Sequence, residues 1–590
     1  MNFPNINILW ANLIIEELIR CGADYFCLSP GSRSSPLVVA MATNPKAKTL
    51  IHYDERGIAF HALGYISATS KPSVVISTSG TATANFFPAI IEASKKKLPL
   101  IVLTADRPPE LHKAGADQTI DQVGIYGDYV RWHFDFPCPT QEIKLEFILT
   151  TIDQAVYMAT RSLSGPIHIN CMFREPLAPT LTKNDFRQYL REVIPWQKSQ
   201  RPYTTYIGSD PSLANEKKRE IIKKILQIKN GLIVVGKLKK FSEQKAVLHL
   251  AEKLNWPVFP DITSGLRSGH SNKNIISHFD QILLSEKFVR TYKCDGVIHI
   301  GGRITSKRWY QYVEQIRPLE YIMILNHPLR NDPLHIVSLR IETDIALFCN
   351  FLTKSIEQRR NTKIISLLKE SSHRVDHIID ESTYNAKSLS EPTVARLVSK
   401  HIPPETGLFL ANSMPIRDMD MFASDTNKFI LGANRGASGI DGTIATATGF
   451  AKGINKIVTL LIGDLAFLHD LNSLALLRDL NHPLIVVVLN NNGGGIFSFL
   501  PIAQFDQIFE KYFGTPHDLH FQSASEMFNL HYANPKTRDE FTADYKNALS
   551  QKKSTIIEIT TDRRENYQIH QKIQKKIQRH LDSLFTATVK

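Results

Sequence analysis

The sequence predicts an α/β protein made of three doubly wound domains, each built on a parallel sheet. Short runs rich in β-branched residues alternate with helix-length segments, an order typical of parallel sheets covered by helices. The chain has 590 residues, too many for one hydrophobic core, so about three domains are expected. Apolar residues make up 43% of the chain, enough to bury the interior of each domain.

The domain boundaries are predicted from shifts in composition along the chain. We expect an N-terminal domain over residues 1–185, a central α/β domain over 200–355 and a C-terminal domain over 389–590. The polar stretch from 186 to 200 is predicted to be an interdomain linker. A second linker, rich in charge, is expected over 356–388.

The charge balance indicates which kinds of molecule the protein binds. Lys and Arg outnumber Asp and Glu by 70 to 57, for a formal net charge of +13. Much of the excess is scattered or lies in short runs, such as Lys95–Lys97 and the tail from Gln571. Such runs are typical of solvated faces, so we predict small anionic substrates in preference to nucleic acid.

The cysteines and the apolar runs indicate the compartment. The six cysteines are widely spaced and include no Cys-x-x-Cys pair, which favours a reducing, cytoplasmic environment without a disulfide framework or zinc cluster. No apolar run reaches the roughly 18 residues needed to span a bilayer, so no membrane span is expected. The N-terminal stretch has no basic leader, and its apolar residues fit one helical face interrupted by Glu16 and Glu17.

The first candidate binding feature follows the strand predicted over Asp24–Leu28. The sequence Ser-Pro-Gly-Ser-Arg, which ends with Ser32 and Arg33, offers small residues, free amides and a guanidinium just before a helix. This combination is typical of an anion-binding corner. A capped turn with a surface arginine is the alternative interpretation.

The rest of the N-terminal segment continues the alternation of strands and helices. A strand to His52 is followed by a helix predicted over Glu55–Ser67, and further strands are expected at Ser73–Ser77 and Leu100–Thr104. Glu55 lies at a strand-to-helix junction, where a carboxylate also complements the helix dipole. The loop after the last of these strands carries Arg107 and Gln118.

The central segment contains a near match to a phosphate-binding loop, beginning at Gly231. The residues between its glycines form an apolar run typical of a strand, and Leu238 stands where Ser or Thr would hold Mg²⁺. We therefore predict no nucleotide site here. With the apolar runs at 297–302 and 321–327, the segment is predicted to be a second parallel α/β domain without a cofactor of its own.

Two polar pairs in this part of the chain allow two interpretations each. Lys307 and Arg308 follow a predicted strand end, where they either face carboxylates or belong to a solvated loop. His373 and His377 are spaced to share one helix face as metal ligands. No third ligand is apparent, so a solvated linker helix is favoured.

The C-terminal segment opens with a strand that ends at Ser413, and Arg417 follows four residues later. Arg435, Gly439 and Ile440 then precede a helix of small residues. Glycines in this position allow the backbone to approach a ligand closely, although a tight helix–sheet contact would also explain them.

One predicted β-α-β unit organises the chemistry. An apolar strand ends at Asp464, a helix is expected over Phe467–Leu480, and a second apolar strand ends before Asn491. A crossover makes the strands parallel, which places Asp464 and Asn491 at the same carboxyl edge of the sheet. With a free backbone carbonyl near Gly493, these oxygens suit Mg²⁺. An ordinary buried unit with polar loop ends is the alternative.

Five motifs, in this order along the chain, resemble those of the 2-succinyl-5-enolpyruvyl-6-hydroxy-3-cyclohexene-1-carboxylate (SEPHCHC) synthases, thiamine diphosphate (ThDP) enzymes of menaquinone biosynthesis. The motifs are SPGSRSSPL, DERG, TADRPPELHKAGADQTIDQ, NRGASGIDG, and GDL followed by NNNGG. The resemblance extends from about residue 8 to about residue 560. Two positions depart from the family pattern, because Leu465 replaces Gly and Asp117 replaces Asn.

The resemblance implies domains of the ThDP-enzyme type and a ThDP cofactor held with Mg²⁺, or with Mn²⁺ in its place. In this family the glutamate at the position of Glu55 bonds N1′ of the cofactor's aminopyrimidine ring. That glutamate and the metal site come from neighbouring chains, so the resemblance implies a homodimer or homotetramer. The implied metal ligands are Asp464, Asn491 and Gly493, and further implied cofactor contacts are Ser413, Gly439 and Ile440.

The implied reaction is decarboxylation of 2-oxoglutarate and 1,4-addition of the succinyl-semialdehyde carbanion to isochorismate. Both substrates are dianions and need a cationic pocket. The implied pocket residues are Ser32, Arg33, Arg107, Lys307, Arg308, Arg417, Arg435 and Phe497, with Gln118 as a second catalytic residue and 504–521 as a mobile cover. Two alternatives stay open. One is another ThDP carboligase or decarboxylase resembling acetolactate synthase; the other is a silent paralogue, which would lack Glu55, Asp464 or Asn491, whereas all three are present.

Overall fold

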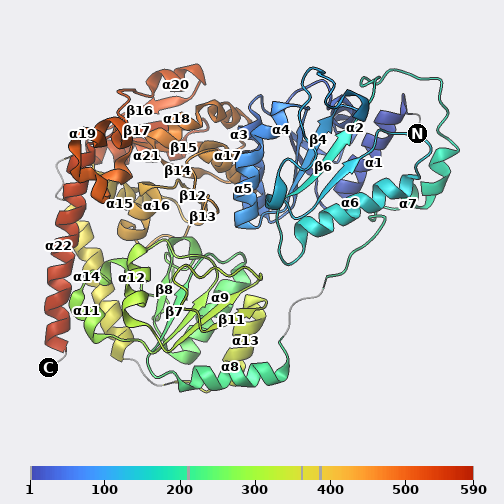
Figure 1. Cartoon of the computed structure of the whole chain (residues 1–590). Coiled ribbons are helices and arrows are strands. Elements are labelled where there is room, and N and C mark those ends of the chain that lie inside the picture. The colour runs from blue at the N-terminus through green and yellow to red at the C-terminus, as the bar shows by residue number, and fades with distance from the viewer. Residues whose placement is uncertain (1–2, 209–212, 360–362, 385–387, 589–590) are drawn as a thin grey trace. The chain divides into compact units, whose positions relative to one another are not determined.

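The structure is a computed structural model of the whole chain, in which residues 3–208, 213–359, 363–384 and 388–588 are described (Figure 1). They form two compact units, and each unit is described by itself. The first unit comprises residues 1–208, 434–458 and 466–484, and the second comprises 209–433, 459–465 and 485–590. Three separate sheets with helices around them confirm the predicted α/β class.

The first sheet has six strands in the order β2-β1-β3-β4-β6-β5. Its strands are β1 (Tyr25–Leu28), β2 (Lys48–Ile51), β3 (Ser73–Ser77), β4 (Leu100–Asp106), β5 (His133–Phe136) and β6 (Ile167–Met172), and its helices include α1 (Ile6–Arg20), α2 (Ser35–Thr43), α3 (Glu55–Thr69), α5 (Phe87–Lys96) and α6 (Leu145–Thr160). Side chains alternate between the two faces of each strand. Phe26 and Val74 therefore join the core with α1, α2 and α6, whereas Cys27 and Val75 join the core with α3 and α5.

The polar stretch expected to be a linker folds against this first domain. It forms the short turns η3 (Tyr189–Val193) and α7 (Ile194–Lys198), and Trp196 is buried in the domain core. Two carboxylates hold it. Glu17 accepts from Trp196 Nε1 and from Tyr203 N at 2.5 Å each, and Asp153 accepts from Thr204 N at 2.6 Å.

Glu17, Cys21 and Asp153 lie within 4.8 Å of one another, the spacing of a metal site. Their contacts give a different explanation, because each oxygen of the two carboxylates already accepts a hydrogen bond from a protein donor. The cluster is thus accounted for by holding residues 196–204 in place. The composition of that stretch shows that it is polar, but it does not show that two buried acids accept its hydrogen bonds.

The Glu17 carboxyl is expected to make stability depend on pH. Burial and its contact with Asp153 raise the pKa of Glu17 from 4.5 to about 8. The folded protein therefore holds a proton that the unfolded chain releases, so stability falls as pH rises through this window. We expect the melting temperature to fall by more than about 3 °C from pH 5 to pH 8, and Glu17→Gln to flatten that slope. Thermal unfolding followed by circular dichroism tests this; equal slopes for both proteins would contradict it.

The second sheet has five strands in the order β11-β10-β9-β7-β8. Its strands are β7 (Gly231–Val235), β8 (Val258–Pro260), β9 (Gly296–Ile300), β10 (Glu320–Leu325) and β11 (Leu339–Glu342), and its helices include α8 (Asn215–Gln227), α9 (Phe241–Leu254), α12 (Lys307–Ile316), α13 (Ile345–Ser355) and α14 (Lys363–Tyr384). The near match to a phosphate loop is the buried strand β7, where a side chain at Gly231 would meet the Trp256 ring. His373 and His377 lie exposed on α14, as a solvated helix face requires.

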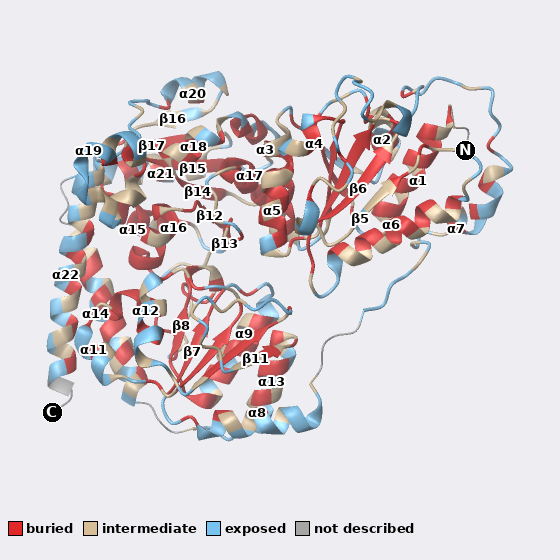
Figure 2. Ribbon diagram, viewed as in Figure 1, coloured by how far each residue is buried: buried red, intermediate tan, exposed pale blue. Residues whose placement is uncertain are grey.

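The basic C-terminal tail is part of the second unit's core. It forms the helix α22 (Arg563–Thr588), in which Ile573, Ile577 and Leu581 recur every fourth residue and are buried. Its lysines occupy the opposite, exposed face, and the two faces are visible as red and pale blue along α22 (Figure 2). The tail therefore folds because one face is apolar, and its charge is the solvated side of a packed helix.

The third sheet has six strands in the order β13-β12-β14-β15-β17-β16. Its strands are β12 (Gly407–Leu410), β13 (Ile430–Ala433), β14 (Val458–Gly463), β15 (Leu484–Asn490), β16 (His531–Ala533) and β17 (Thr555–Thr560), and its helices include α15 (Glu391–His401), α16 (Met414–Phe422) and α21 (Arg538–Ser550). The helix α17 (Thr443–Ile454) belongs to the first unit, where it crosses α3 closely. A Cβ on Gly449 would lie 1.8 Å from the His61 carbonyl, so only glycine allows this crossing.

The helix predicted over Phe467–Leu480 differs from the prediction. The chain forms a short helix, α18 (Asp464–His469), and then 3₁₀ turns, η5 (Leu471–Asp479). The break comes at Asp470, whose buried carboxylate accepts from Ala445 N and from Ser473 Oγ. The side chain thus satisfies backbone outside its own helix, which the apolar spacing of the segment does not reveal.

Among the helices that the structure describes, none is both long and apolar enough to cross a membrane.

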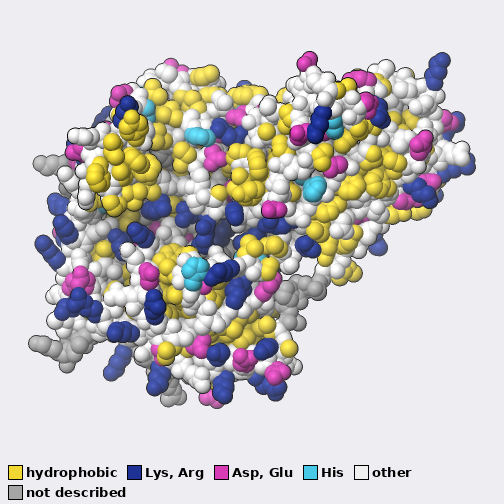
Figure 3. Space-filling model, in the orientation of Figure 1, with side chains coloured by type: hydrophobic (Ala, Val, Ile, Leu, Met, Phe, Trp, Pro, Cys, Tyr) yellow, Lys and Arg dark blue, Asp and Glu magenta, His cyan; other side chains and the backbone are white. Residues whose placement is uncertain are grey.

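Figure 3 shows Lys and Arg side chains spread over the second unit, for example around α22 and α8.

Candidate active site

Asp464, Asn491 and Gly493 lie together at the ends of the adjacent strands β14 and β15. Asp464 is 2% exposed and Asn491 is 7% exposed. The backbone N–H of Gly493 donates to Asp464 Oδ2 at 2.8 Å and so joins the two strand ends. We call these three residues the metal corner, because they offer a carboxylate, an amide oxygen and a backbone carbonyl.

The polar atoms of the metal corner suit a divalent cation. Asn491 Nδ2 donates to Glu391 Oε1 at 2.7 Å, whereas the buried Oδ1 has no hydrogen-bond partner among the residues that the structure describes. A buried acceptor without a donor is costly unless a ligand satisfies it. Burial raises the pKa of Asp464, although donors from Gly493 and Leu465 oppose that effect. A cation bound between Asp464 and Asn491 would satisfy both groups.

The turn after Asn491 depends on Gly493. Its φ of +130° lies in a region that L-residues rarely adopt, and a Cβ there would lie 1.9 Å from the Gly514 carbonyl. Gly494 N donates to the same carbonyl at 2.7 Å. The metal corner is thus packed directly against the segment before residue 515.

Gly493→Ala is expected to disturb the metal corner while the sheets stay folded. Because neither the φ angle nor the packing admits a Cβ, the turn must shift and carry the Gly493 carbonyl with it. We expect Mg²⁺-dependent cofactor affinity to fall by about 10-fold or more in calorimetry. Gly208→Ala is the control, since a Cβ there has nothing within 4 Å. Unchanged affinity for Gly493→Ala would contradict the strain argument.

Residues 504–521, expected to form a cover, run past the metal corner. Asn492 Oδ1 accepts from His517 N and Asp518 N at 2.8 Å each, and His517 Nε2 lies 3.2 Å from Asp464 Oδ2. The Phe497 ring packs edge-on against Phe513, with centroids 5.6 Å apart. Sequence reasoning missed His517, because only the folded loop brings its ring to Asp464.

A buried polar group lies behind Asn491 and was also missed from the sequence. Burial and the nearby Asp418 carboxylate raise the pKa of Glu391 to about 8, and burial raises that of Asp418 well above its usual range. His570 Nε2 lies 3.2 Å from Asp418 Oδ1, and burial lowers the pKa of His570 to about 4. These residues come from α15, α16 and α22, so no spacing in the chain signals their contact.

The expected substrate cations of the second unit have different surroundings. Lys307 begins α12 and is exposed, whereas Arg308 donates to the buried Asp280 at 2.6 Å. Arg417 donates to the Ser413 carbonyl. Ser413 itself has φ +68° and ψ −131°, a sparsely populated backbone region that is found often at ligand sites.

In the first unit, Arg33 and Arg107 form a basic corner at the strand ends. Arg33 is 9% exposed and donates to the Phe173 carbonyl at 2.9 Å, while its buried Nε has no partner in the described part of the chain. Burial, and then the charge of Arg107, lowers the pKa of Arg33. Arg107 donates to Ser79 Oγ at 2.6 Å. Ser32 lies exposed beside this corner.

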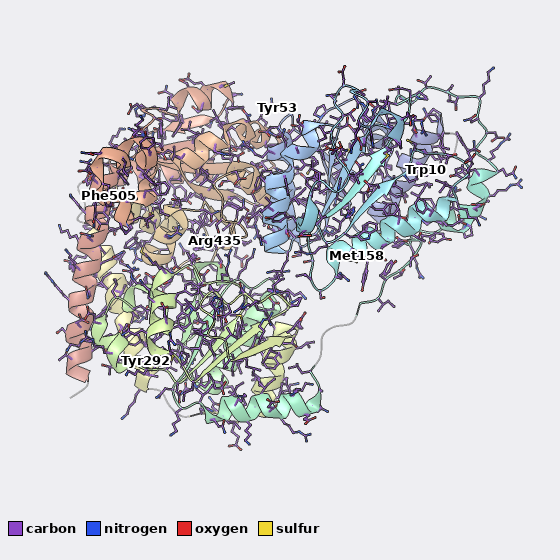
Figure 4. The ribbon with its side chains drawn as sticks, in the orientation of Figure 1. Trp10, Tyr53, Met158, Tyr292, Arg435 and Phe505 are labelled. Carbon is purple, nitrogen blue, oxygen red and sulfur yellow. The ribbon has the colours of Figure 1, made fainter. Side chains whose placement is uncertain are left out.

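Glu55 is the first residue of α3 and is half-buried. The helix starts here because Asp54 is the N-cap, whose side chain accepts from Gly57 N at 3.1 Å. The structure gives the Glu55 carboxylate no hydrogen bond or ion pair to any described residue. The preceding Ile51 and Tyr53 are 61% and 60% exposed, and Tyr53 is marked in Figure 4.

The remaining expected residues of the first unit lie in loops. Glu92 accepts from Gly436 N and Ala437 N at 2.8 and 2.6 Å and so holds the loop that carries Arg435 (Figure 4), Gly439 and Ile440. Ile440 is 38% exposed. Gln118 is exposed with φ +53°, and Asp117 beside it is exposed too. The predicted residues thus form local groups in both units.

Comparisons with known proteins agree along the chain. Residues 10–125 match a family model described as the N-terminal TPP binding domain of thiamine pyrophosphate enzymes, and 419–559 match the C-terminal TPP binding domain. Residues 187–410 match the middle domain of thiamine pyrophosphate enzymes. A structure described as a putative thiamin diphosphate-dependent enzyme from Mycobacterium smegmatis has the same fold, with TM-score 0.69, 16% identity and coverage of 94% of this chain and 99% of that one.

Curated relatives share much more of the sequence. The 2-succinyl-5-enolpyruvyl-6-hydroxy-3-cyclohexene-1-carboxylate synthase of Rubrobacter xylanophilus is 45% identical, covering 97% of this chain and 98% of its own length. The synthases of Pelodictyon phaeoclathratiforme and Salinibacter ruber are 44% and 40% identical, each covering 99% of this chain and 98% of their own. The chain therefore belongs to the SEPHCHC synthase family of thiamine pyrophosphate enzymes.

Proposed function

We propose that the protein decarboxylates 2-oxoglutarate and adds the resulting four-carbon unit to isochorismate, using ThDP and Mg²⁺, with Mn²⁺ as an alternative metal. The observation that carries the proposal is the 45% identity to a named synthase over nearly the whole of both chains. The buried amide oxygen of Asn491 beside Asp464 supports it independently, since it suits the metal that would hold a diphosphate.

Some residues of the protein would bind the metal and the cofactor, and others would handle protons. Asp464, Asn491 and the Gly493 carbonyl would bind the metal, and Ser413, Gly439 and Ile440 would contact the cofactor. When bound, ThDP supplies the electron sink that makes loss of CO₂ from a 2-oxo acid feasible. The Glu55 carboxylate would hold a proton at the aminopyrimidine ring, and the side chain of Gln118 would act as a polar partner.

The substrates are both dianions, so cations must orient them. The buried, unpartnered Nε of Arg33 beside Arg107 supports such a role, because a carboxylate would satisfy it. The proposed substrate residues are Ser32, Arg33, Arg107, Lys307, Arg308, Arg417, Arg435 and Phe497.

We include a homo-oligomer, at least a dimer, in the proposal. The exposed apolar side chains of Ile51 and Tyr53 next to the unpaired Glu55 support it, because a second chain would cover them. A cytoplasmic location is supported by the unpaired state of Cys27 and the other cysteines.

The deciding experiment is incubation of the purified protein with ThDP, Mg²⁺, 2-oxoglutarate and isochorismate, followed by mass analysis of the product. We expect the SEPHCHC adduct and release of CO₂. Replacing 2-oxoglutarate by pyruvate tests the acetolactate-synthase-like alternative. Product from pyruvate alone, or no product from any pair while ThDP is bound, would overturn the proposal.

A further inference from the structure

We propose that Glu391 is a positioning residue that orients the side-chain amide of Asn491, so that its Oδ1 faces the metal, and that Asp418 and His570 hold Glu391 for this task. The inference rests on the metal corner of the proposed function and adds to it residues from α15, α16 and α22.

The two ends of the Asn491 amide differ in what they can bind. The oxygen and the NH₂ group have nearly the same shape, and only the oxygen can bind a cation. Glu391 Oε1 accepts from Nδ2 at 2.7 Å, which assigns the NH₂ end to the side away from the corner. A Cβ on Gly495 would lie 2.5 Å from Nδ2, so the amide is also confined there. The remaining oxygen is the buried, unpartnered Oδ1.

Glu391 meets Asn491 as an acceptor in a buried setting. Glu391 is 1% exposed, and the Asp418 side chain near its carboxyl group is fully buried as well. The Asn491 Nδ2 group can only donate, so the Glu391 Oε1 that it meets at 2.7 Å is its acceptor. In this buried setting no water replaces that acceptor, and Glu391 fixes the NH₂ end of the amide.

The C-terminal helix α22 lies behind the two acids. His570 of α22 lies with Nε2 3.2 Å from Asp418 Oδ1. Its ring is edge-on to Phe422 and Phe499, with centroids 4.9 Å away in each case. The aromatic rings fix the imidazole, and the imidazole limits where Asp418 can move. Groups that support ligands in this way commonly change metal affinity by about 10- to 100-fold.

The cost of this arrangement argues for a role beyond packing. Burying two carboxyl groups and an imidazole is unfavourable, and apolar residues of similar volume often give a more stable core. Only the contact with Asn491 needs a hydrogen-bond acceptor, because the acceptor selects one orientation of the amide. A purely structural tie between α15, α16 and α22 would gain as much from apolar side chains.

The test measures Mn²⁺ affinity by electron paramagnetic resonance, with ThDP present, for wild type, Glu391→Leu and Glu391→Gln. We expect Glu391→Leu to weaken Mn²⁺ binding by about 10- to 100-fold. Gln keeps the size of Glu and a carbonyl oxygen for Asn491, so Glu391→Gln should stay within about 3-fold of wild type. Glu243→Leu is the matched control, since Glu243 is a buried acid of the same unit that accepts from backbone N–H groups.

The outcomes separate the possible failures. Wild type that binds no Mn²⁺ in the presence of ThDP would overturn the proposed metal corner itself. Normal Mn²⁺ affinity in folded Glu391→Leu would overturn the positioning role alone. If the leucine variant does not fold, Glu391→Gln decides: affinity within about 3-fold of wild type supports an acceptor oxygen as the orienting group, and a loss of about 10-fold or more would overturn it. In an Asn491→Ala background, Glu391→Leu should cause no further loss; an equal further loss would overturn the proposal.

Discussion

The Glu55→Gln protein is expected to bind ThDP and Mg²⁺ nearly as wild type does, yet to turn over 2-oxoglutarate on the order of 10²- to 10⁴-fold more slowly. Glu55 starts α3 half-buried, and no described residue pairs with its carboxylate. Gln can still accept a hydrogen bond, but it cannot take up a proton. The loss should therefore fall on proton transfer and leave cofactor binding largely intact.

Two measurements separate these effects. Calorimetry gives the ThDP affinity, and the rate of hydrogen–deuterium exchange at the cofactor's C2, followed by NMR, gives proton transfer. Glu142→Gln is the control, because Glu142 is an exposed acid of the same unit. Unchanged turnover in Glu55→Gln would remove Glu55 from the mechanism. An equal loss of binding and turnover would mean that the side chain holds the cofactor and does not handle a proton.

The Asp464→Ala protein is expected to lose Mg²⁺-dependent ThDP binding by a factor of about 10² or more. Asp464 is the carboxylate of the metal corner and is 2% exposed. Its removal takes away the negative charge and also leaves the Gly493 N–H without its acceptor. Both effects act at the same place, so the turn and the metal are expected to be lost together.

Calorimetric titration of ThDP with and without Mg²⁺ measures this loss. Wild type should show a large difference between the two titrations, and Asp464→Ala should show little. Asp539→Ala serves as control, since Asp539 is an exposed acid in the first turn of α21. Retained Mg²⁺-dependent affinity in Asp464→Ala would move the metal site elsewhere.

Much of the fold follows from local pattern. The strand predicted at Ser73–Ser77 has those bounds, because five apolar or small residues between turn signals fill a buried strand. The helix predicted to begin at Glu55 begins there, since Asp54 is a strong N-cap. The closeness of Asp464 and Asn491 also follows from sequence, because a crossover between adjacent strands brings their ends to one edge.

Other elements depended on partners distant in the chain. The stretch that holds Trp196 was predicted to be a linker, but hydrogen bonds to Glu17 and Asp153 fix it to the first domain. The basic tail was predicted to be a solvated face, but its isoleucines are buried in a core. The helix expected over Phe467–Leu480 broke because Asp470 bonds to Ala445. In each case a contact with residues distant in the chain decided the structure, and the local pattern does not encode that contact.

The amino-acid sequence by itself determined the α/β class, the order in which the site motifs follow the strands, and the family. These follow from periodicity and from motifs that are local in the chain. Only the tertiary structure decided which groups stand behind the motifs. Glu391, Asp418 and His570 come from three helices and meet solely through packing. Their contact exists because packing in a core brings side chains together whatever their separation in the sequence. No pattern along the chain gives the distance between them in space.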